Sequence, residues 1–466
     1  MRAYFGGPKL LMRQLSMVIA SLLLAGCSTT IGALYEPAGT RPSDPRDIFI
    51  ALDGTGSNQL SRTNVSRLYE LVDNAGANRP RATYYGEGVG TGARFVGAAT
   101  GWGIGQDVRE AYLFLIDNWR SEDRLFLSGF SRGAYTARIL GGLIAVAGIP
   151  DLSKYPPKER PRIVERIYDA YKTKRRPNES LEGQNRRRLQ AITRILGERP
   201  RGAGGGIVIE ALALWDTVEA LGLPDRTIDP LEDLDQYFLT VCNVKAAFHA
   251  LALDDNRAYS FTPIFINTPA MRKACPNWHP QIEEVWFAGA HADVGGSYTP
   301  GGRTDGFLPG VSLNWMLDKL RHYRLFDASA RAFEDPEGPI HDAKAYSAAY
   351  KPLYRYRREP LRYASKVPEV NGGKPFVHES AIRRLARAKM LDRRFDRCTD
   401  RTLKPRLLCS EDLEANGFVA ELKESGCLIE NEDGFVLREG ERCVTIVTPG
   451  EAISSPASGT PWRMAD

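Results

Sequence analysis

A serine at position 131 lies in a five-residue pattern typical of a catalytic nucleophile. The pattern is Gly129-Phe130-Ser131-Arg132-Gly133, between an apolar run at 124–129 and a helix expected over 131–145. Glycine–x–serine–x–glycine between a strand and a helix is a sharp turn that lifts the serine above a sheet. Glycine tolerates the close backbone approach there, and the backbone N–H of Arg132 can face a developing oxyanion. The sequence therefore predicts Ser131 as the nucleophile of an acyl transfer.

A serine needs a histidine as general base. We expect His291 in this role, because it follows the apolar run 285–289 in a glycine-flanked loop. His378 is the runner-up base. His249 lies in the apolar run 246–251, which we interpret as a helical face that gives this histidine a core or supporting role. Every histidine follows Ser131, so chain order alone does not choose among them: His249, His279, His291, His322, His341 and His378.

The base in turn needs a carboxylate to orient it, and Asp216 is the expected one. It follows the apolar run 207–214, and it lies between Ser131 and His291, in the order that this kind of site uses. An N-cap of the next helix is the alternative role for Asp216. Asp293 is too close along the chain to His291 for the usual arrangement, and we expect it to hold the loop. Asp53 is the remaining candidate.

A second oxyanion donor is expected from the loop Asp53-Gly54-Thr55-Gly56, where Gly54 and Thr55 carry backbone N–H groups. Asp53 could instead bind a cation or a phosphate. No G-x-x-x-x-G-K-[ST] phosphate loop occurs in the sequence. The glycine-rich run 86–92 follows no strong apolar run, so we interpret it as a mobile loop near the site. We expect neither a metal nor a cofactor.

The elements that must position these residues are short apolar strands alternating with helices. The strands are expected at 48–52, 124–129, 207–214 and 285–289, and a helix is expected at 113–119. Such alternation favours a mostly parallel sheet covered on both faces. Sites in such sheets lie at the carboxyl ends of the strands, which is where the candidate residues occur. The predicted fold class is α/β, of the α/β-hydrolase type.

Four ordered segments resemble the α/β-hydrolase catalytic domain of type VI secretion phospholipase effectors (Tle-type). The resemblance covers roughly residues 46–390. It implies lipid ester hydrolysis, with Ser131 as nucleophile, His291 as base and Asp216 as the group that orients it. The segments are Asp53-Gly54-Thr55, 129–134, 215–218 and 286–298, and segments 250–257 and 313–316 are also similar to the family.

The N-terminal residues have the pattern of an export signal. Arg2, Lys9 and Arg13 precede an apolar run from Leu15 to Ala25, which is too short to span a membrane and fits a secretory signal. The following Leu24-Ala25-Gly26-Cys27 resembles a lipobox, so Cys27 is the expected lipidation site and residues 1–27 the signal peptide. Residues 28–46 are expected to form a tether. We expect a resident, lipid-anchored enzyme of the bacterial envelope, at the outer membrane and facing the periplasm.

Export makes disulfides possible for the six remaining cysteines. Six cysteines allow 15 pairings, and sequence alone does not choose one. Local spacing suggests Cys398–Cys409 and Cys427–Cys443, which leaves Cys242 and Cys275. Buried free thiols are the alternative.

The expected catalytic domain spans residues 47–394. Within it, residues 150–206 are predicted to form two basic amphipathic helices. These helices could form a lid over the active face, or an ordinary cap with a solvated, charged surface. Residues 395–466 are expected to form a small β-rich module, tied by disulfides. An aromatic and basic stretch at 354–358 could suit single-stranded nucleic acid. An exported lipoprotein seldom meets that ligand, so we expect no nucleic-acid partner.

Composition narrows the function classes. The 62 basic and 57 acidic side chains give a net charge of +5, which does not favour a nucleic-acid binder. The sequence predicts a serine hydrolase that cleaves carboxylic esters, above all lipid or phospholipid acyl esters, through an acyl-enzyme. The alternatives are an inactive envelope lipoprotein that acts as a binding or scaffold protein, and a metal-dependent hydrolase that uses Asp53 and Asp293.

Overall fold

The computed structural model describes most of the chain. The described residues are 31–35, 44–54, 56–75, 79–88, 102–218, 237, 241–257, 261–298, 308–346, 358–404, 406–415, 417–438, 443–459 and 463–464. Cys27 and Thr55 lie outside these residues, as does most of the glycine-rich run 86–92. Among the described residues, no helix has both the length and the apolar character needed to cross a membrane.

A nine-stranded sheet forms the centre of the molecule. Its strand order is β1-β3-β2-β4-β5-β6-β8-β9-β12. β1 is antiparallel to β3, and all other neighbours in the sheet are parallel. The strands are β1 (Ile31–Tyr35), β2 (Asp47–Leu52), β3 (Arg81–Gly86), β4 (Arg124–Phe130), β5 (Ile209–Trp215), β6 (Val244–Ala252), β8 (Gln281–Phe287), β9 (Phe376–His378) and β12 (Thr445–Val447).

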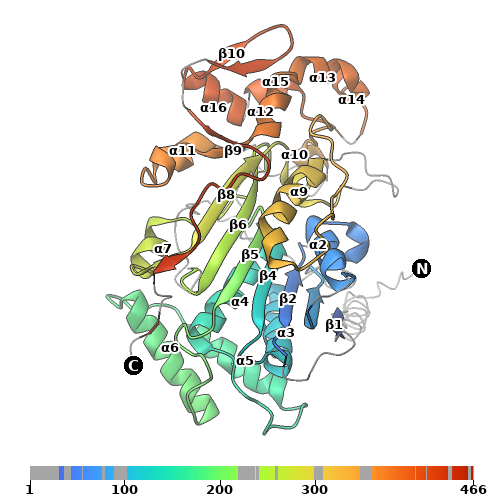
Figure 1. Cartoon of the computed structure of the whole chain (residues 1–466). Coiled ribbons are helices and arrows are strands. Elements are labelled where there is room, and N and C mark those ends of the chain that lie inside the picture. The colour runs from blue at the N-terminus through green and yellow to red at the C-terminus, as the bar shows by residue number, and fades with distance from the viewer. Residues whose placement is uncertain are drawn as a thin grey trace, which may run out of the picture.

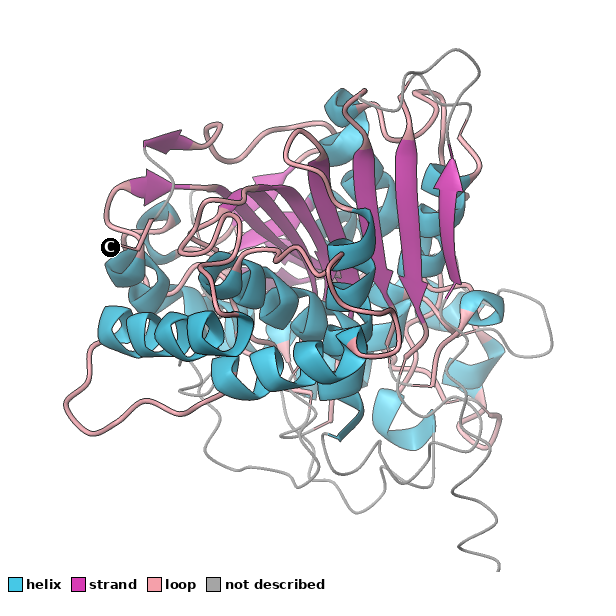
Figure 2. Ribbon diagram, turned by 90° about the horizontal axis from the view of Figure 1, so that it is seen from below, coloured by secondary structure: helices cyan, strands magenta, loops and turns pink. Residues whose placement is uncertain are grey.

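Helices cover both faces of the sheet, as Figure 2 shows. Alternate residues of β2 point to opposite faces, with Ile48 and Ile50 in one buried cluster and Phe49 and Ala51 in the other. The first cluster packs against α3 (Trp102–Asn118), α4 (Arg132–Ala147), α5 (Arg160–Tyr171) and α6 (Leu181–Leu196); the second packs against α2 (Asn64–Asp73) and α9 (Leu308–Leu320). Burial on both faces explains the near-continuous apolar strands, and the α/β-hydrolase fold class is confirmed.

The register of the sheet aligns the carboxyl ends of the central strands. Leu52 pairs with Gly129, and Phe130 pairs with Trp215. The residues that follow these strand ends, among them Asp53, Ser131 and Asp216, therefore lie along one edge of the sheet.

Three strands differ from the expectations. Residues 246–251, expected as a helical face, belong to β6, which is buried between β5 and β8. A short apolar run fits a buried strand as well as a buried helix. Here the run forms a strand because it pairs with β5 and β8. A strand, β3, does lead into the glycine-rich run, although its sequence Arg-Ala-Thr-Tyr-Tyr-Gly is not strongly apolar. Part of the expected tether forms β1 at the edge of the sheet.

Helices α5 and α6, within the segment expected to form a lid or a solvated cap, flank the sheet. Both pack into the same buried cluster as α3 and α4. The two ends of the segment meet at the far end of α4, where Ile149 N–H donates to Arg201 O at 3.0 Å. The last turns of α5 lie near the first turn of α4, because Tyr168 and Tyr135 both contact Tyr237. The loop 172–180 that joins the two helices therefore lies at the end of α4 that carries Ser131.

Residues 395–466 are neither a separate module nor mainly β. β12 joins the main sheet beside β9, and β13 (Ser458–Gly459) pairs with β7 (Trp278–His279). Figure 1 shows these last residues, in red, running from the end that carries α12 and α16 back to α7. The other elements of this half are α7 (Pro269–Ala274), α8 (His291–Gly295), α10 (Ala343–Tyr346), α11 (Pro360–Ser365), α12 (Glu379–Leu385), α13 (Ala388–Arg394), α14 (Asp396–Thr399), α15 (Ser410–Ala415), α16 (Phe418–Glu424), β10 (Leu428–Glu430) and β11 (Phe435–Leu437).

Three disulfides join the six cysteines that follow Cys27 in the sequence. They are Cys242–Cys275, Cys398–Cys409 and Cys427–Cys443, the pairs that local spacing suggests. The first ties the start of β6 to the end of α7, and the other two lie in the C-terminal part. Each closes a loop of the unfolded chain and so lowers its entropy.

Candidate active site

Ser131 occupies a strained turn between β4 and α4. Its backbone angles are φ 58° and ψ −126°, a region that non-glycine residues seldom adopt. Its N–H donates to Trp215 O at 3.0 Å, so the serine lies beside the carboxyl end of β5. Backbone strain of this kind occurs mostly at functional sites, which makes Ser131 the centre of the candidate site.

The glycines on either side of Ser131 are required by close contacts. A Cβ on Gly133 would lie 2.1 Å from Leu52 O and 2.5 Å from Asp53 O. A Cβ on Gly129 would lie 2.5 Å from Ala134 Cα. These atoms all belong to the backbone, so the spacing of the two glycines follows from the tight approach of α4 to the sheet.

His291 and Asp216 form a buried hydrogen-bonded pair beside this turn. His291 Nδ1 lies 2.5 Å from Asp216 Oδ2. The ring of Phe130, the neighbour of Ser131, packs on the His291 ring with centroids 4.6 Å apart, and Phe261 packs on it edge-on at 5.4 Å. The structure thus brings together the expected acid, the expected base and the turn that carries the expected nucleophile.

The electrostatics of the pair favour a charged acid and a neutral base. Burial by itself raises the pKa of Asp216, but the Arg358 charge and the His291 bond outweigh it and hold this pKa well below its usual range. Burial lowers the pKa of His291, and the bond to Asp216 offsets this effect only in part. At neutral pH His291 is therefore unprotonated and can accept a proton.

Arg358 is a member of the site that the sequence did not point to. Its side chain is 0% exposed, and it lies 2.7 Å from Asp216 Oδ1 and 3.0 Å from Asp216 Oδ2. In the sequence Arg358 ends the aromatic and basic stretch 354–358, which gives it the appearance of a surface residue. No local pattern marks it, because its partner is 142 residues away.

His249 supports the loop that carries Asp216. Thr217 N–H donates to His249 Nε2 at 3.0 Å, and His249 Nδ1 lies 2.9 Å from Glu284 Oε1. Glu284 also accepts the N–H groups of Ile266 and Asn267. The supporting role expected for His249 therefore agrees with the structure, but from a strand and not from a helix.

The loop that begins at Asp53 lies against Ser131. A Cβ on Gly54 would lie 3.2 Å from Ser131 Cβ, so Gly54 permits this approach. The Gly54 N–H donates to Asp53 Oδ1 at 2.7 Å and is thus engaged. Thr55, another expected donor, lies outside the described residues. The third expected donor, Arg132, is the first residue of α4, and the N–H groups at the start of a helix favour negative charge.

Asp53 and Asp293 hold loops together. Asp53 accepts hydrogen bonds from Thr63 Oγ1 at 2.6 Å and Tyr85 Oη at 2.5 Å, and burial raises its pKa to about 6. Asp293 lies 2.6 Å from His341 Nδ1 and accepts the Ala290 N–H at 3.0 Å. Both oxygens of each aspartate are therefore engaged by protein groups, which compete with any metal ion for these oxygens.

His378, the runner-up base, lies elsewhere. It stacks on Phe287 with centroids 4.8 Å apart, and its Nδ1 lies 2.8 Å from Ser380 Oγ at the start of α12. Burial lowers its pKa to about 4. None of the contacts of His378 among the described residues involves Ser131 or Asp216.

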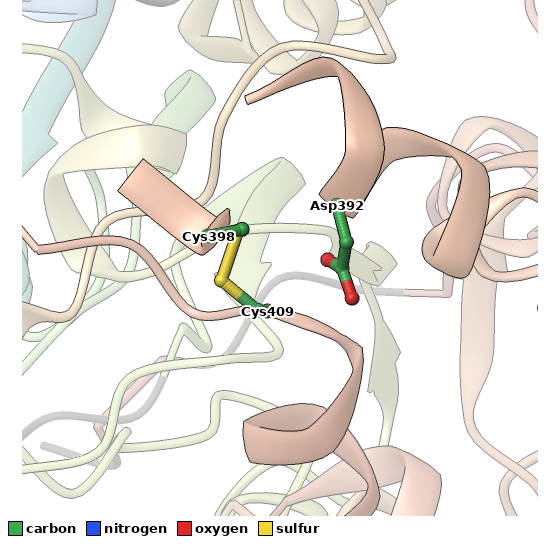
Figure 3. A group of neighbouring side chains, drawn as sticks. All are labelled: Asp392, Cys398 and Cys409. Carbon is green, nitrogen blue, oxygen red and sulfur yellow. A yellow bond between two sulfur atoms is a disulfide. The ribbon is translucent and has the colours of Figure 1, made fainter. Parts of the chain in front are cut away.

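A cluster of Asp392, Cys398 and Cys409 has the composition of a metal site, but its sulfur atoms are bonded to each other (Figure 3). Asp392 caps α15 instead, since it accepts the Ser410 N–H at 3.0 Å. A disulfide offers no thiolate ligand, and this cluster is structural.

Comparisons with known proteins place the chain in a family. Residues 46–319 match the family model described as "T6SS, Phospholipase effector Tle1-like, catalytic domain". An uncharacterized protein of Saccharomyces cerevisiae is 29% identical over 247 residues, which are 48% of this chain and 33% of that protein.

Solved structures are more distant. An uncharacterized protein from Pseudomonas aeruginosa has 17% identity and a TM-score of 0.36, over 68% of this chain and 49% of that chain. The carboxylesterase Cest-2923 from Lactobacillus plantarum has 14% identity and a TM-score of 0.36, over 65% and 95%. The chain thus spans about a third of the yeast relative and about half of the Pseudomonas chain. Because the family model covers more than half of the chain, the protein belongs to the family of Tle1-like phospholipase effector catalytic domains of type VI secretion.

Proposed function

We propose that the protein is a serine hydrolase that cleaves carboxylic esters through an acyl-enzyme. The observation that carries the proposal is the buried Asp216–His291 pair beside the strained Ser131 turn. Family membership supports the same chemistry.

The reaction proceeds in two steps. In the first, Ser131 Oγ attacks the ester carbonyl while His291 Nε2 takes its proton, and the backbone N–H groups of Arg132 and, from the Asp53 loop, of Thr55 stabilise the oxyanion. The alcohol leaves with the proton from His291, so that an acyl group stays on Ser131. In the second step His291 takes a proton from water, which attacks this acyl group, and the proton passes to Ser131 Oγ as the bond to the acyl group breaks and the acid leaves. Asp216 keeps Nδ1 of His291 protonated throughout.

A fluorophosphonate probe tests the nucleophile. We expect the wild-type protein to be labelled and Ser131→Ala to show neither labelling nor ester hydrolysis, because the hydroxyl that forms the covalent bond is gone. Ser128→Ala is the matched control, since Ser128 is buried on β4, the strand that leads to the Ser131 turn, and its Oγ has no hydrogen-bond partner among the described residues. A folded wild-type protein that resists the probe would favour the inactive, binding protein; loss of hydrolysis on chelation would favour a metal-dependent enzyme.

We further propose lipid, above all phospholipid, acyl esters as the substrate. The family supports this class. Charge supports it independently: residues 150–206 carry 15 basic and 7 acidic side chains, a net charge of +8, whereas the whole chain has +5. The exposed Lys174, Arg175 and Arg176 lie in the loop 172–180, at the end of α4 that carries Ser131. Such a surface attracts anionic lipid headgroups.

Replacing Lys174, Arg175 and Arg176 by serine tests the lipid substrate. We expect fatty-acid release from vesicles of phosphatidylglycerol to fall by roughly tenfold or more, since each basic residue contributes about 1 kcal/mol to binding an anionic surface. Hydrolysis of a water-soluble short-chain ester is expected to stay at the wild-type rate. A wild-type protein that cleaves the soluble ester but no vesicle lipid would contradict the lipid substrate. The proposal of an ester hydrolase would then still stand.

The lipid anchor at Cys27 remains part of the proposal. An anchor at the outer membrane would keep the enzyme beside its substrate, and multiple acyl chains would hold it firmly. A Cys27→Ala protein that still fractionates with membranes would contradict the anchor.

A further inference from the structure

The buried side chain of Arg358 contacts two backbone carbonyls in addition to the Asp216 carboxylate. Its two terminal nitrogens lie on the two oxygens of Asp216, at 2.7 and 3.0 Å. They also donate to Ala252 O at 3.1 Å and to Phe261 O at 2.7 Å. The guanidinium thus joins the acid, the end of β6 and the loop whose Phe261 ring packs on His291.

Burial of the Arg358 guanidinium is unfavourable by itself. Removing a guanidinium from water costs several kcal/mol, and a paired carboxylate offsets this cost only when the geometry is good. Asp216 already has other donors, because Ala252 N–H donates to its Oδ1 at 3.0 Å and His291 Nδ1 lies at Oδ2. A fixed, fork-shaped partner on both oxygens adds one property that these donors lack: it sets the plane of the carboxylate.

We propose that Arg358 is a positioning residue for the reaction: it locks the Asp216 carboxylate in the orientation that the bond to His291 requires, and it offsets the charge of that carboxylate. The proposal rests on the proposed serine hydrolase chemistry. The family model matches residues 46–319. Arg358 lies beyond this range, so the match to the family says nothing about its role.

The offset of charge has a kinetic consequence. The charged groups around His291 are Asp216 with Arg358 and Asp255 with Arg257; Asp255 Oδ2 accepts the His291 N–H at 3.1 Å and lies 2.7 Å from Arg257 Nη2. Asp293, on the same short helix, pairs with His341. Removing Arg358 leaves one carboxylate charge in excess beside the imidazole, which favours imidazolium and raises the pKa of His291. Because the base must be neutral, the acidic limb of kcat/KM then moves to higher pH.

Arg358→Met and Arg358→Lys test the proposal, with the soluble ester as substrate over a range of pH. For Arg358→Met we expect kcat to fall by roughly 100-fold, since a small misplacement of a catalytic group has this effect, and the acidic limb to move up. For Arg358→Lys we expect an intermediate kcat, because one ammonium cannot hold both oxygens, and an acidic limb at the wild-type position, because the charge is kept.

Arg46→Met is the matched control. Arg46 forms an almost equally buried pair with Asp123, 2.9 Å apart, at the amino end of the sheet. We expect a comparable loss of thermal stability with kcat and the pH profile of the wild type. If Arg358→Met changes kcat and the acidic limb no more than Arg46→Met does, or if Arg358→Lys equals the wild type in kcat, the proposal is overturned. A wild-type protein that no fluorophosphonate labels would instead refute the proposed function.

Discussion

An alanine in place of His291 is expected to lower kcat for ester hydrolysis by about 10⁴- to 10⁶-fold. The loss is this large because the histidine acts in both steps: it removes the proton of Ser131 and later that of water. The remaining rate comes from the oxyanion donors and from binding. Steady-state hydrolysis of a soluble ester by the purified variant measures kcat, and the thermal melting temperature shows whether the fold is retained.

His378→Ala serves as the control for this prediction. His378 is also a buried histidine, but it stacks on Phe287 and contacts Ser380 at the start of α12. We expect its loss to cost some stability and to leave kcat within a few fold of the wild type. The assignment of the base fails if His378→Ala loses most of the activity while His291→Ala keeps it.

The sequence predicts the parts of this site that follow local rules. Apolar runs that stop at Asp53, Ser131, Asp216 and His291 mark strand ends, and a parallel sheet brings its carboxyl ends to one edge. The glycines at 129 and 133 mark the turn because any side chain would overlap the backbone there. The fold class and the neighbourhood of Asp216 and His291 are therefore readable from one sequence.

Contacts between distant segments are not readable in this way. Arg358 looks like a surface residue in its own stretch, and only the folded chain shows Asp216 as its partner. The strand β12 has three residues and pairs with β9 about 70 positions earlier, so its place in the main sheet has no local signal. β6 has the apolar composition of a buried helix as much as of a strand. In each case the information lies in what the segment packs against.

A single methyl group on Gly133 is expected to destabilise the whole fold. A Cβ at this position would lie 2.1 Å from Leu52 O and 2.5 Å from Asp53 O, at the end of a central strand. Neither oxygen can move without breaking the sheet or the Asp53 loop. We expect Gly133→Ala to lower the free energy of unfolding by about 3–5 kcal/mol, the range of severe backbone and overpacking defects. The shift of the urea unfolding midpoint measures this loss.

Gly141→Ala provides the control within the same helix. Among the described residues outside its own helix, a Cβ on Gly141 would meet only Ile209 Cδ1, at 3.4 Å, an ordinary van der Waals contact. Alanine is also a better helix former than glycine by about 1 kcal/mol, so we expect Gly141→Ala to be as stable as the wild type or more so. Equal midpoints for the two variants would mean that α4 can withdraw from the sheet at Gly133. The strained backbone of Ser131 would then not depend on this close approach, and the turn that carries the nucleophile would need another cause.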